Sequence, residues 1–204
     1  ESHGLVERLT REVVGLALEQ ARRWRVAGRR LRMSVNVSID TLERLEFADY
    51  VLAELDRFGI DGGDLVLEIT ESRLPSDARI VLDVVTRLRL RGVGLSIDDF
   101  GTGNSSLAQL RDIPFVELKV DKGFVHGARE RATLSAIFRA SVGLAHQLRM
   151  SAVGEGVESL SDWEFARAAG CDLLQGYFVA RPMPAEGLEA WERAWRSREL
   201  EYSR

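Results

Sequence analysis

Six short apolar segments alternate with longer amphipathic segments along this chain, and this repeat limits its possible folds more than any other feature. The short segments are rich in aliphatic and β-branched residues, as strands are, and the longer ones carry apolar residues at helical spacing. The alternation predicts an α/β fold of parallel strands with right-handed helical crossovers, in an open sheet or a closed barrel. The strands are expected at residues 31–38, 65–70, 94–98, 116–120, 151–153 and 172–175. The helices are expected at residues 6–24, 40–58 with Asp40 as its cap, 76–90, 105 onward, 130–148, 161–169 and 185–195.

The composition agrees with one globular domain over residues 1–204. A chain of 204 residues, 45% of them hydrophobic, can bury a sizeable core. Its net charge of -4 gives no long-range attraction to polyanions, so we expect no DNA binding. The single cysteine, Cys171, excludes an internal disulfide and fits a reducing compartment. Without a signal peptide or an apolar run near the ~20 residues that span a bilayer, we expect a soluble cytoplasmic domain with no membrane contact.

Each predicted strand has a polar residue at or just past its carboxyl end. An open sheet gathers ligand groups mainly at one switch point, whereas a closed barrel brings every strand end to one mouth. Polar groups from six successive strands therefore favour a TIM-like (βα) barrel. Since such a barrel has eight strands and ~250 residues, we expect its first two strands to be missing from the printed chain. The polar residues are Asn36, Glu68, Asp98 with Asp99, Lys119, Glu155 and Gln175.

The adjacent aspartates Asp98 and Asp99 are the strongest local signal for chemistry. Two neighbouring like charges are costly unless cations neutralise them, and a carboxylate that bridges two metal ions is common in hydrolytic sites. Taken alone, the pair also fits a helix cap in an ordinary loop. Glu68 and Glu155 need partners if buried; a salt bridge would serve either one, but Lys119 cannot match all these carboxylates. Oxygen ligands without a His or Cys cluster favour magnesium or manganese over structural zinc.

Six motifs that follow one another in a fixed order give the chain a specific resemblance to a known family. They are Val35-Asn36-Val37-Ser38, Glu68-Ile69-Thr70-Glu71-Ser72, Asp98-Asp99-Phe100-Gly101-Thr102-Gly103, Lys119-Val120-Asp121, Glu155-Gly156-Val157-Glu158 and Gln175-Gly176-Tyr177-Phe178. Over about residues 16–184 the chain resembles the EAL-type cyclic di-GMP phosphodiesterases. The resemblance implies an eight-stranded barrel whose first strand runs antiparallel to the rest. It also implies hydrolysis of one phosphodiester of cyclic di-GMP to linear pGpG with two magnesium or manganese ions.

Roles for individual residues follow from the same resemblance. Asn36, Glu68 and Asp98 resemble ligands of the first metal ion, and Asp98, Asp99 and Glu155 resemble ligands of the second. Asp98 would then bridge the two ions, and no nucleophilic side chain would be required.

The resemblance further implies residues that act beside the metal ligands. Lys119 would contact the attacking water or the scissile phosphate, and Glu71 would brace the loop after Asp99. The expected catalytic residues are Lys119, Glu155 and Glu71, and those expected to position the substrate or its metal are Asn36, Asp121 and Gln175.

The chain departs from the family's pattern at two places. The Glu-Ala-Leu motif, whose Glu completes the first metal site, does not occur at the expected place. We expect it to lie upstream of the printed chain, which would make this an N-terminally incomplete EAL domain, or to be absent from the protein, which would leave hydrolysis weak or absent. Asn104 replaces the usual aromatic residue in a loop that the family links to dimer contact. We nevertheless expect a homodimer.

Three functions stay open at this point. The first is a cyclic di-GMP phosphodiesterase attached to an upstream sensory, receiver or cyclase-like domain. The second is a catalytically inactive EAL domain that binds cyclic di-GMP or a protein partner. The third, from the barrel alone, is a metal-dependent enzyme that uses Lys119 as a base on a carboxylate substrate, and the Asp98-Asp99 pair disfavours it.

Overall fold

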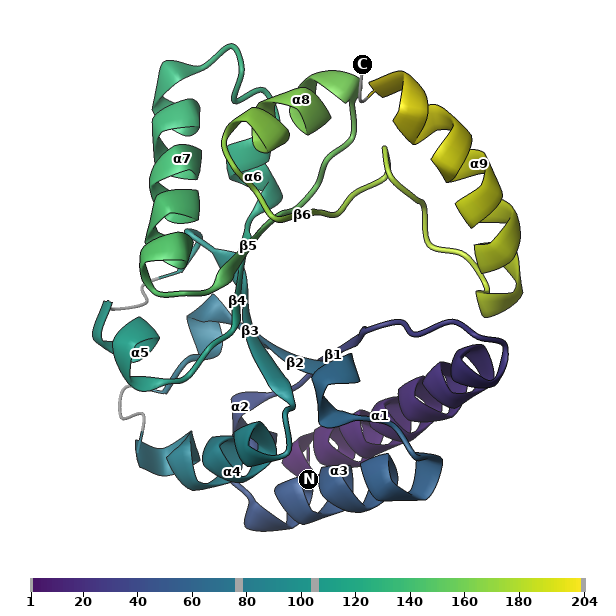
Figure 1. The fold of residues 1–204 in the computed structure, drawn as a ribbon. Coiled ribbons are helices and arrows are strands. Elements are labelled where there is room, and N and C mark those ends of the chain that lie inside the picture. The colour runs from purple at the N-terminus through teal and green to yellow at the C-terminus, as the bar shows by residue number, and fades with distance from the viewer. Residues whose placement is uncertain (1, 76–78, 104–106, 203–204) are drawn as a thin grey trace.

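A six-stranded parallel sheet forms the centre of the computed structural model, which describes residues 2–75, 79–103 and 107–202. The strand order is β1-β2-β3-β4-β5-β6, so each strand pairs with the next one along the chain. The sheet curls into a half-barrel with helices around its outer face (Figure 1), which confirms the predicted TIM-like α/β fold. The strands are β1 Met33–Asn36, β2 Leu65–Thr70, β3 Gly94–Phe100, β4 Glu117–Val120, β5 Ser151–Gly154 and β6 Leu173–Leu174.

The two edges of the sheet are β1 and β6 in the part of the chain that the structure describes. The half-barrel is therefore not closed by strand pairing among these residues. That two further strands precede the printed chain stays a prediction.

The parallel register brings the carboxyl ends of the strands, with their polar residues, to the same end of the sheet. Asn36 pairs with Glu68 across β1 and β2, and Thr70 pairs with Asp98 across β2 and β3. Between Ile97 and Phe100 the register of β3 against β4 shifts, which bends the strand where its aspartates lie.

The helices occupy most of the expected segments. Predicted residues 76–78 and 104–106 lie outside the described residues, so the starts of two expected helices are not tested. The α-helices are α1 Ser2–Val26, α2 Ile39–Leu42, α3 Leu45–Phe58, α4 Arg79–Leu90, α5 Leu107–Asp112, α6 Lys122–Val125, α7 Ala132–Gln147, α8 Leu160–Ala168 and α9 Leu188–Tyr202. Short 3-10 helices are η1 Gly62–Asp64, η2 Glu71–Arg73 and η3 Ala185–Gly187.

The prediction of one helix over residues 40–58 capped by Asp40 is wrong. The structure has two helices, α2 and α3, and the residue at the cap of α2 is Ser38. Arg44, between them, has the extended φ of -105°. The break is explained by packing: Leu42 and Phe47 are both fully buried, and five residues on one continuous helix would point them about 140° apart. The break lets both side chains enter the core.

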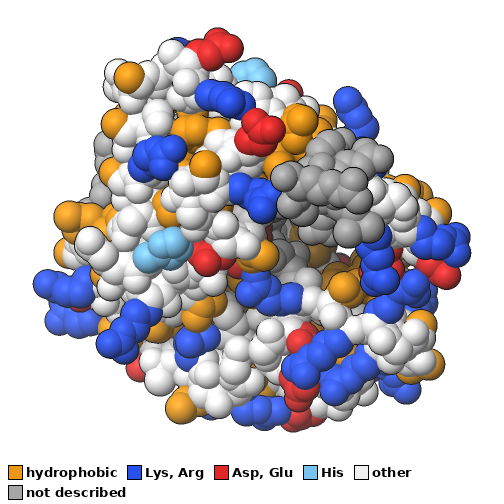
Figure 2. All heavy atoms as spheres, turned by 45° about the horizontal axis from the view of Figure 1, so that its top comes forward, with side chains coloured by type: hydrophobic (Ala, Val, Ile, Leu, Met, Phe, Trp, Pro, Cys, Tyr) orange, Lys and Arg blue, Asp and Glu red, His pale blue; other side chains and the backbone are white. Residues whose placement is uncertain are grey.

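The central strands are buried on both faces, as expected for a parallel sheet covered by helices. Leu65, Leu67 and Ile69 on β2 have no solvent exposure, and Val66 between them is also buried. On the face drawn in Figure 2, basic and acidic side chains are interspersed over the surface. Among the described helices, none combines the length and the apolar composition that crossing a bilayer would need.

Candidate metal centre

Lys119 is the hub of a charged cluster at the carboxyl ends of the middle strands. Its Nζ lies 3.1 Å from Oε2 of Glu68, 2.9 Å from Oδ1 of Asp98 and 2.7 Å from Oε1 of Glu155. Lys119 is 3% exposed and Glu68 is 6% exposed. Four consecutive strands, β2 to β5, thus deliver these side chains to one point, because parallel pairing aligns their ends.

One lysine does not neutralise the carboxylates around it. Asp98, Asp99 and Glu155 each offer a carboxylate oxygen, and these oxygens lie within 4.8 Å of one another. Burial raises the pKa of Asp99, and the charges of Asp98 and Asp121 raise it further. Burial also raises the pKa of Glu155 to about 7, although the hydrogen bond from Lys119 acts in the opposite direction. The cluster therefore holds more negative charge than its protein surroundings stabilise.

This donor set fits a hard divalent cation. Carboxylate oxygens are the ligands that magnesium and manganese prefer, and a cation would offset the burial and the repulsion that raise the pKa values of Asp99 and Glu155. Asp99 adopts a positive φ of 56°, which is uncommon for a residue other than glycine. Such a conformation next to a charged cluster is typical of a functional position.

Lys119 is held as a cation. Burial alone would lower its pKa, but hydrogen bonds to Glu155 and Asp98, with the charge of Glu68, raise the pKa above its ordinary value. An ammonium group with a raised pKa is a poor proton acceptor near neutral pH. This geometry argues against the enolase-like alternative, in which Lys119 would act as a base.

Glu71 contacts the loop that follows the aspartate pair. Its Oε2 accepts hydrogen bonds from the backbone N–H of Gly101 at 2.7 Å and of Gly103 at 3.0 Å. Gly101 has a φ of +102°, and a Cβ there would lie 2.5 Å from the ring of Phe124. The contact between Glu71 and this loop matches the expected one; the catalytic role of Glu71 stays a prediction. Asn104, farther along the loop, lies outside the described residues.

The predicted residues on the edge strands lie in a more open setting. Asn36, at the end of β1, and Gln175, just after β6, are both exposed. Gln175 lines a cavity of about 340 Å³ that also reaches Glu68 and Lys119. Asp121 accepts a hydrogen bond from the N–H of Gly123 at 2.8 Å and so caps α6, a helix that the sequence analysis did not expect.

The same cavity contains a second ion pair that the sequence analysis did not predict. Arg32, just before β1, reaches across to Glu117 on β4, and both line the cavity together with Ser34. Glu117 is 3% exposed, so this pair places a further buried charge below Lys119. Strand alternation was the available signal, since Arg32 and Ser34 share a face with Asn36, and Glu117 shares one with Lys119.

A curled parallel βα sheet with an acidic cluster at its strand ends defines a class of half-barrel domain with an acidic rim. The chain belongs to the EAL domain family, whose model matches residues 1–182.

Relatives and solved structures agree with this assignment. The chain is 38% identical over 197 residues to "Cyclic di-GMP phosphodiesterase NbdA" of Pseudomonas aeruginosa, covering 96% of this chain and 25% of that protein. A structure of a PaMucR phosphodiesterase in complex with c-di-GMP matches with a TM-score of 0.85 and 39% identity, over 92% of this chain and 76% of that one. A manganese and cy-diGMP complex of BlrP1 from Klebsiella pneumoniae matches with a TM-score of 0.79 and 27% identity, over 86% and 45%. The chain spans about a quarter of the length of several curated relatives that it matches.

Proposed function

We propose that this EAL domain hydrolyses one phosphodiester of cyclic di-GMP, giving linear pGpG, with two magnesium or manganese ions. The observation that carries the proposal is the cluster of Asp98, Asp99 and Glu155 around Lys119 at the strand ends. The names of the relatives support the substrate: NbdA is named a cyclic di-GMP phosphodiesterase, and the PaMucR and BlrP1 structures are complexes with this nucleotide.

The proposed ligands form two overlapping sets. Asn36, Glu68 and Asp98 would hold one ion, and Asp98, Asp99 and Glu155 would hold the other. Bound magnesium or manganese supplies Lewis acidity, which lowers the pKa of a coordinated water and offsets charge on the leaving oxygen. The manganese complex of BlrP1 supports the choice of a hard divalent ion, as does the all-oxygen donor set.

The protein's own contribution is a preorganised set of charges. Lys119 keeps its proton and can donate a hydrogen bond to the attacking water or to the scissile phosphate. Its contacts to three carboxylates hold these side chains together before substrate arrives. Glu71 fixes the loop after Asp99 through two backbone N–H groups, so the position of Asp99 is set by a buried side chain.

Two further residues would orient the nucleotide. Gln175 lines the cavity beside the cluster and is exposed, so its amide can donate to and accept from a bound ligand. Asp121 would act on the substrate or its metal through the oxygen that does not cap α6.

A second candidate is a receptor that binds cyclic di-GMP without turnover. One observation favours it: Glu68 is already engaged by Lys119, and the other ligand proposed for that ion besides Asp98 is the neutral Asn36. The first ion would then be held more weakly than the second.

Turnover and binding assays separate the two candidates. The protein is incubated with cyclic di-GMP and Mg²⁺ or Mn²⁺, and the products are resolved by chromatography. The phosphodiesterase predicts accumulation of pGpG that stops when the metal is chelated and when calcium replaces it. The receptor predicts saturable binding with no pGpG at any metal concentration.

The surroundings of the domain form part of the proposal. Because the curated relatives extend far beyond the matched segment, we expect this domain to work beside a sensory or other regulatory domain. We also expect a homodimer, which sedimentation equilibrium of the purified protein would test.

A further inference from the structure

The C-terminal helix α9 holds the segment that carries Gln175. Trp191 on α9 donates a hydrogen bond from its indole Nε1 to the carbonyl of Val179, at 2.9 Å. Val179 lines the same cavity as Gln175, Glu68 and Lys119. A side chain on the helix thus fixes the backbone of the cavity wall, four residues after Gln175.

This wall segment, residues 175–180, is a compact turn bonded to the loop after Glu155. The N–H groups of Val179 and Ala180 both donate to the carbonyl of Gly176. Val157 donates its N–H to the carbonyl of Gln175 at 3.0 Å, and its own carbonyl accepts from the N–H of Phe178 at 2.9 Å.

The approach between these two backbones is close. A Cβ on Gly176 would lie 2.2 Å from the carbonyl oxygen of Val157, so only glycine fits there. Val157 is fully buried and follows Glu155 by two residues. A shift of the wall would therefore move both Gln175 and the loop that follows Glu155.

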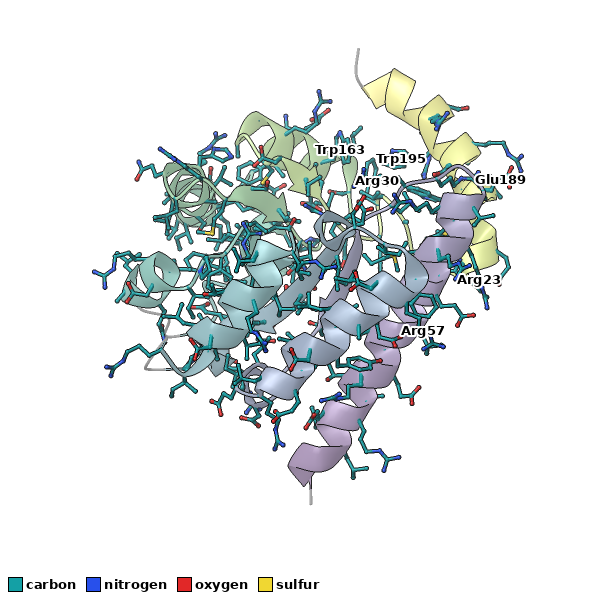
Figure 3. All side chains as sticks on the ribbon, turned by 60° about the horizontal axis from the view of Figure 1, so that its bottom comes forward. Arg23, Arg30, Arg57, Trp163, Glu189 and Trp195 are labelled. Carbon is teal, nitrogen blue, oxygen red and sulfur yellow. The ribbon has the colours of Figure 1, made fainter. Side chains whose placement is uncertain are left out.

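An aromatic cluster packs α9 against this wall. Trp191 stacks on Trp195 at 6.0 Å between ring centroids, and Trp195 meets Trp163 of α8 edge-on at 5.4 Å and Phe178 at 6.3 Å. Figure 3 shows Trp163 and Trp195 together where α8 meets α9. Such contacts contribute beyond their buried area, and they place Phe178, inside the wall, against the helix.

The ion pairs that join α9 to the loop before β1 are weaker than its aromatic contacts. Arg29, in the loop before β1, lies 3.2 Å from Glu192 and 3.9 Å from Glu189. In Figure 1, α9 crosses the open side of the half-barrel between α8 and α1. Because these side chains are partly exposed, their ion pairs contribute little, and the aromatic contacts and the Trp191 hydrogen bond dominate.

We infer that Trp191 is a positioning residue for nucleotide binding: its hydrogen bond to Val179 holds the 175–180 wall, and with it Gln175, in the geometry that the ligand requires. The inference rests on the proposed function and extends it to a residue that touches neither the metal ligands nor the cavity.

The chain offers a matched control for this hydrogen bond. Trp163 belongs to the same cluster, and its buried indole Nε1 has no hydrogen-bond partner within the described residues. Trp191→Phe and Trp163→Phe therefore make the same chemical change, but only the first removes a hydrogen bond.

The two variants are compared by kinetics and by amide hydrogen exchange. We expect Trp191→Phe to raise the KM for cyclic di-GMP about three- to tenfold, the worth of one hydrogen bond, with kcat within about twofold. Amide exchange should become faster in residues 175–180 of that variant. Trp163→Phe should change neither quantity, and both variants should keep the melting temperature within a few degrees.

Three results would overturn the inference. Equal effects of the two variants would assign the cluster to packing alone. An unchanged KM in Trp191→Phe, or a loss confined to its melting temperature, would assign the bond to stability. If the wild-type protein does not turn over cyclic di-GMP, the proposed hydrolysis fails; the dissociation constant of the nucleotide and the exchange rates then decide the role of Trp191 by the same comparison.

Discussion

The middle strands of the sheet and its two edges hold their polar side chains in different ways. On β2 to β5, Glu68, Asp98 and Glu155 converge on the buried Lys119 and are largely shielded from solvent. At the edges, Asn36 and Gln175 are exposed. A substitution in the middle should therefore change stability and chemistry together, whereas a substitution at an edge should change ligand binding alone.

The largest effect is expected where the two proposed metal sites overlap. Asp98→Ala removes the carboxylate proposed to bridge both ions, and Glu155→Ala removes one from the second ion. Each should lower turnover of cyclic di-GMP at least about 1,000-fold, equivalent to about 4 kcal/mol of transition-state stabilisation. Initial rates at saturating Mg²⁺ or Mn²⁺ measure the loss. Unchanged turnover in both variants would remove the proposed centre, and Glu130→Ala, at an exposed acidic residue outside the six motifs, serves as a control.

A stability effect should follow from removing the hub. Lys119→Met leaves Glu68, Asp98 and Glu155 without their common cation, and breaking a buried ion pair from one side costs about 3 kcal/mol. Urea unfolding of the metal-free protein should show this loss, and added Mn²⁺ should restore part of it by replacing the missing charge. Lys122→Met provides the control, because Lys122 is exposed. Equal stability of the two variants would contradict the role of Lys119 as the hub.

The pH dependence of stability should show that ionised Glu155 destabilises the metal-free protein. The pKa of Glu155 is raised from 4.5 to about 7, so the folded state favours its neutral form. Its contribution to stability is fully present below about pH 4.5 and is lost as the pH rises through about 7. The melting temperature of the metal-free wild-type protein, relative to Glu155→Gln, should fall between pH 5 and 8. Saturating Mg²⁺ should flatten this difference, and a difference that does not vary with pH would contradict the raised pKa.

The sequence predicted the sheet better than the helices between its strands. Residues 65–70 were expected as a strand and form β2 with the same bounds, because an apolar β-branched run suits a strand buried on both faces. The break at Arg44 was not expected, since the local pattern favours one helix. That break is set by Leu42 and Phe47, which must both reach a core that distant segments build.

The candidate site could be predicted only in part from the sequence, because some of its contacts also join distant segments. The positions of Glu68, Asp98 and Glu155 at strand ends follow from the repeat itself, because parallel strands end at one rim. Strand alternation could place Arg32 and Glu117 on the cavity side, but the two residues are 85 positions apart, so no local spacing encodes their pairing. The capping of α6 by Asp121 was missed because four residues are too few for a helical period to show.

The smallest effect is expected at the β1 edge, where Asn36 tests whether an exposed neutral ligand matters at all. Asn36 pairs in register with Glu68, so its amide would lie next to the first proposed metal ion without being part of the Lys119 cluster. Asn36→Ala should leave urea unfolding unchanged within about 0.5 kcal/mol, as for most exposed positions. It should nevertheless raise the concentration of Mn²⁺ needed for half-maximal turnover by about tenfold, the loss of one metal contact. Asn36→Asp should reverse that shift, because a carboxylate is a stronger ligand for a hard cation. If Asn36→Ala destabilises the fold as much as Lys119→Met does, the contrast between the middle and the edges of the sheet does not hold, because the edge would then be as tightly coupled to the core as the hub itself.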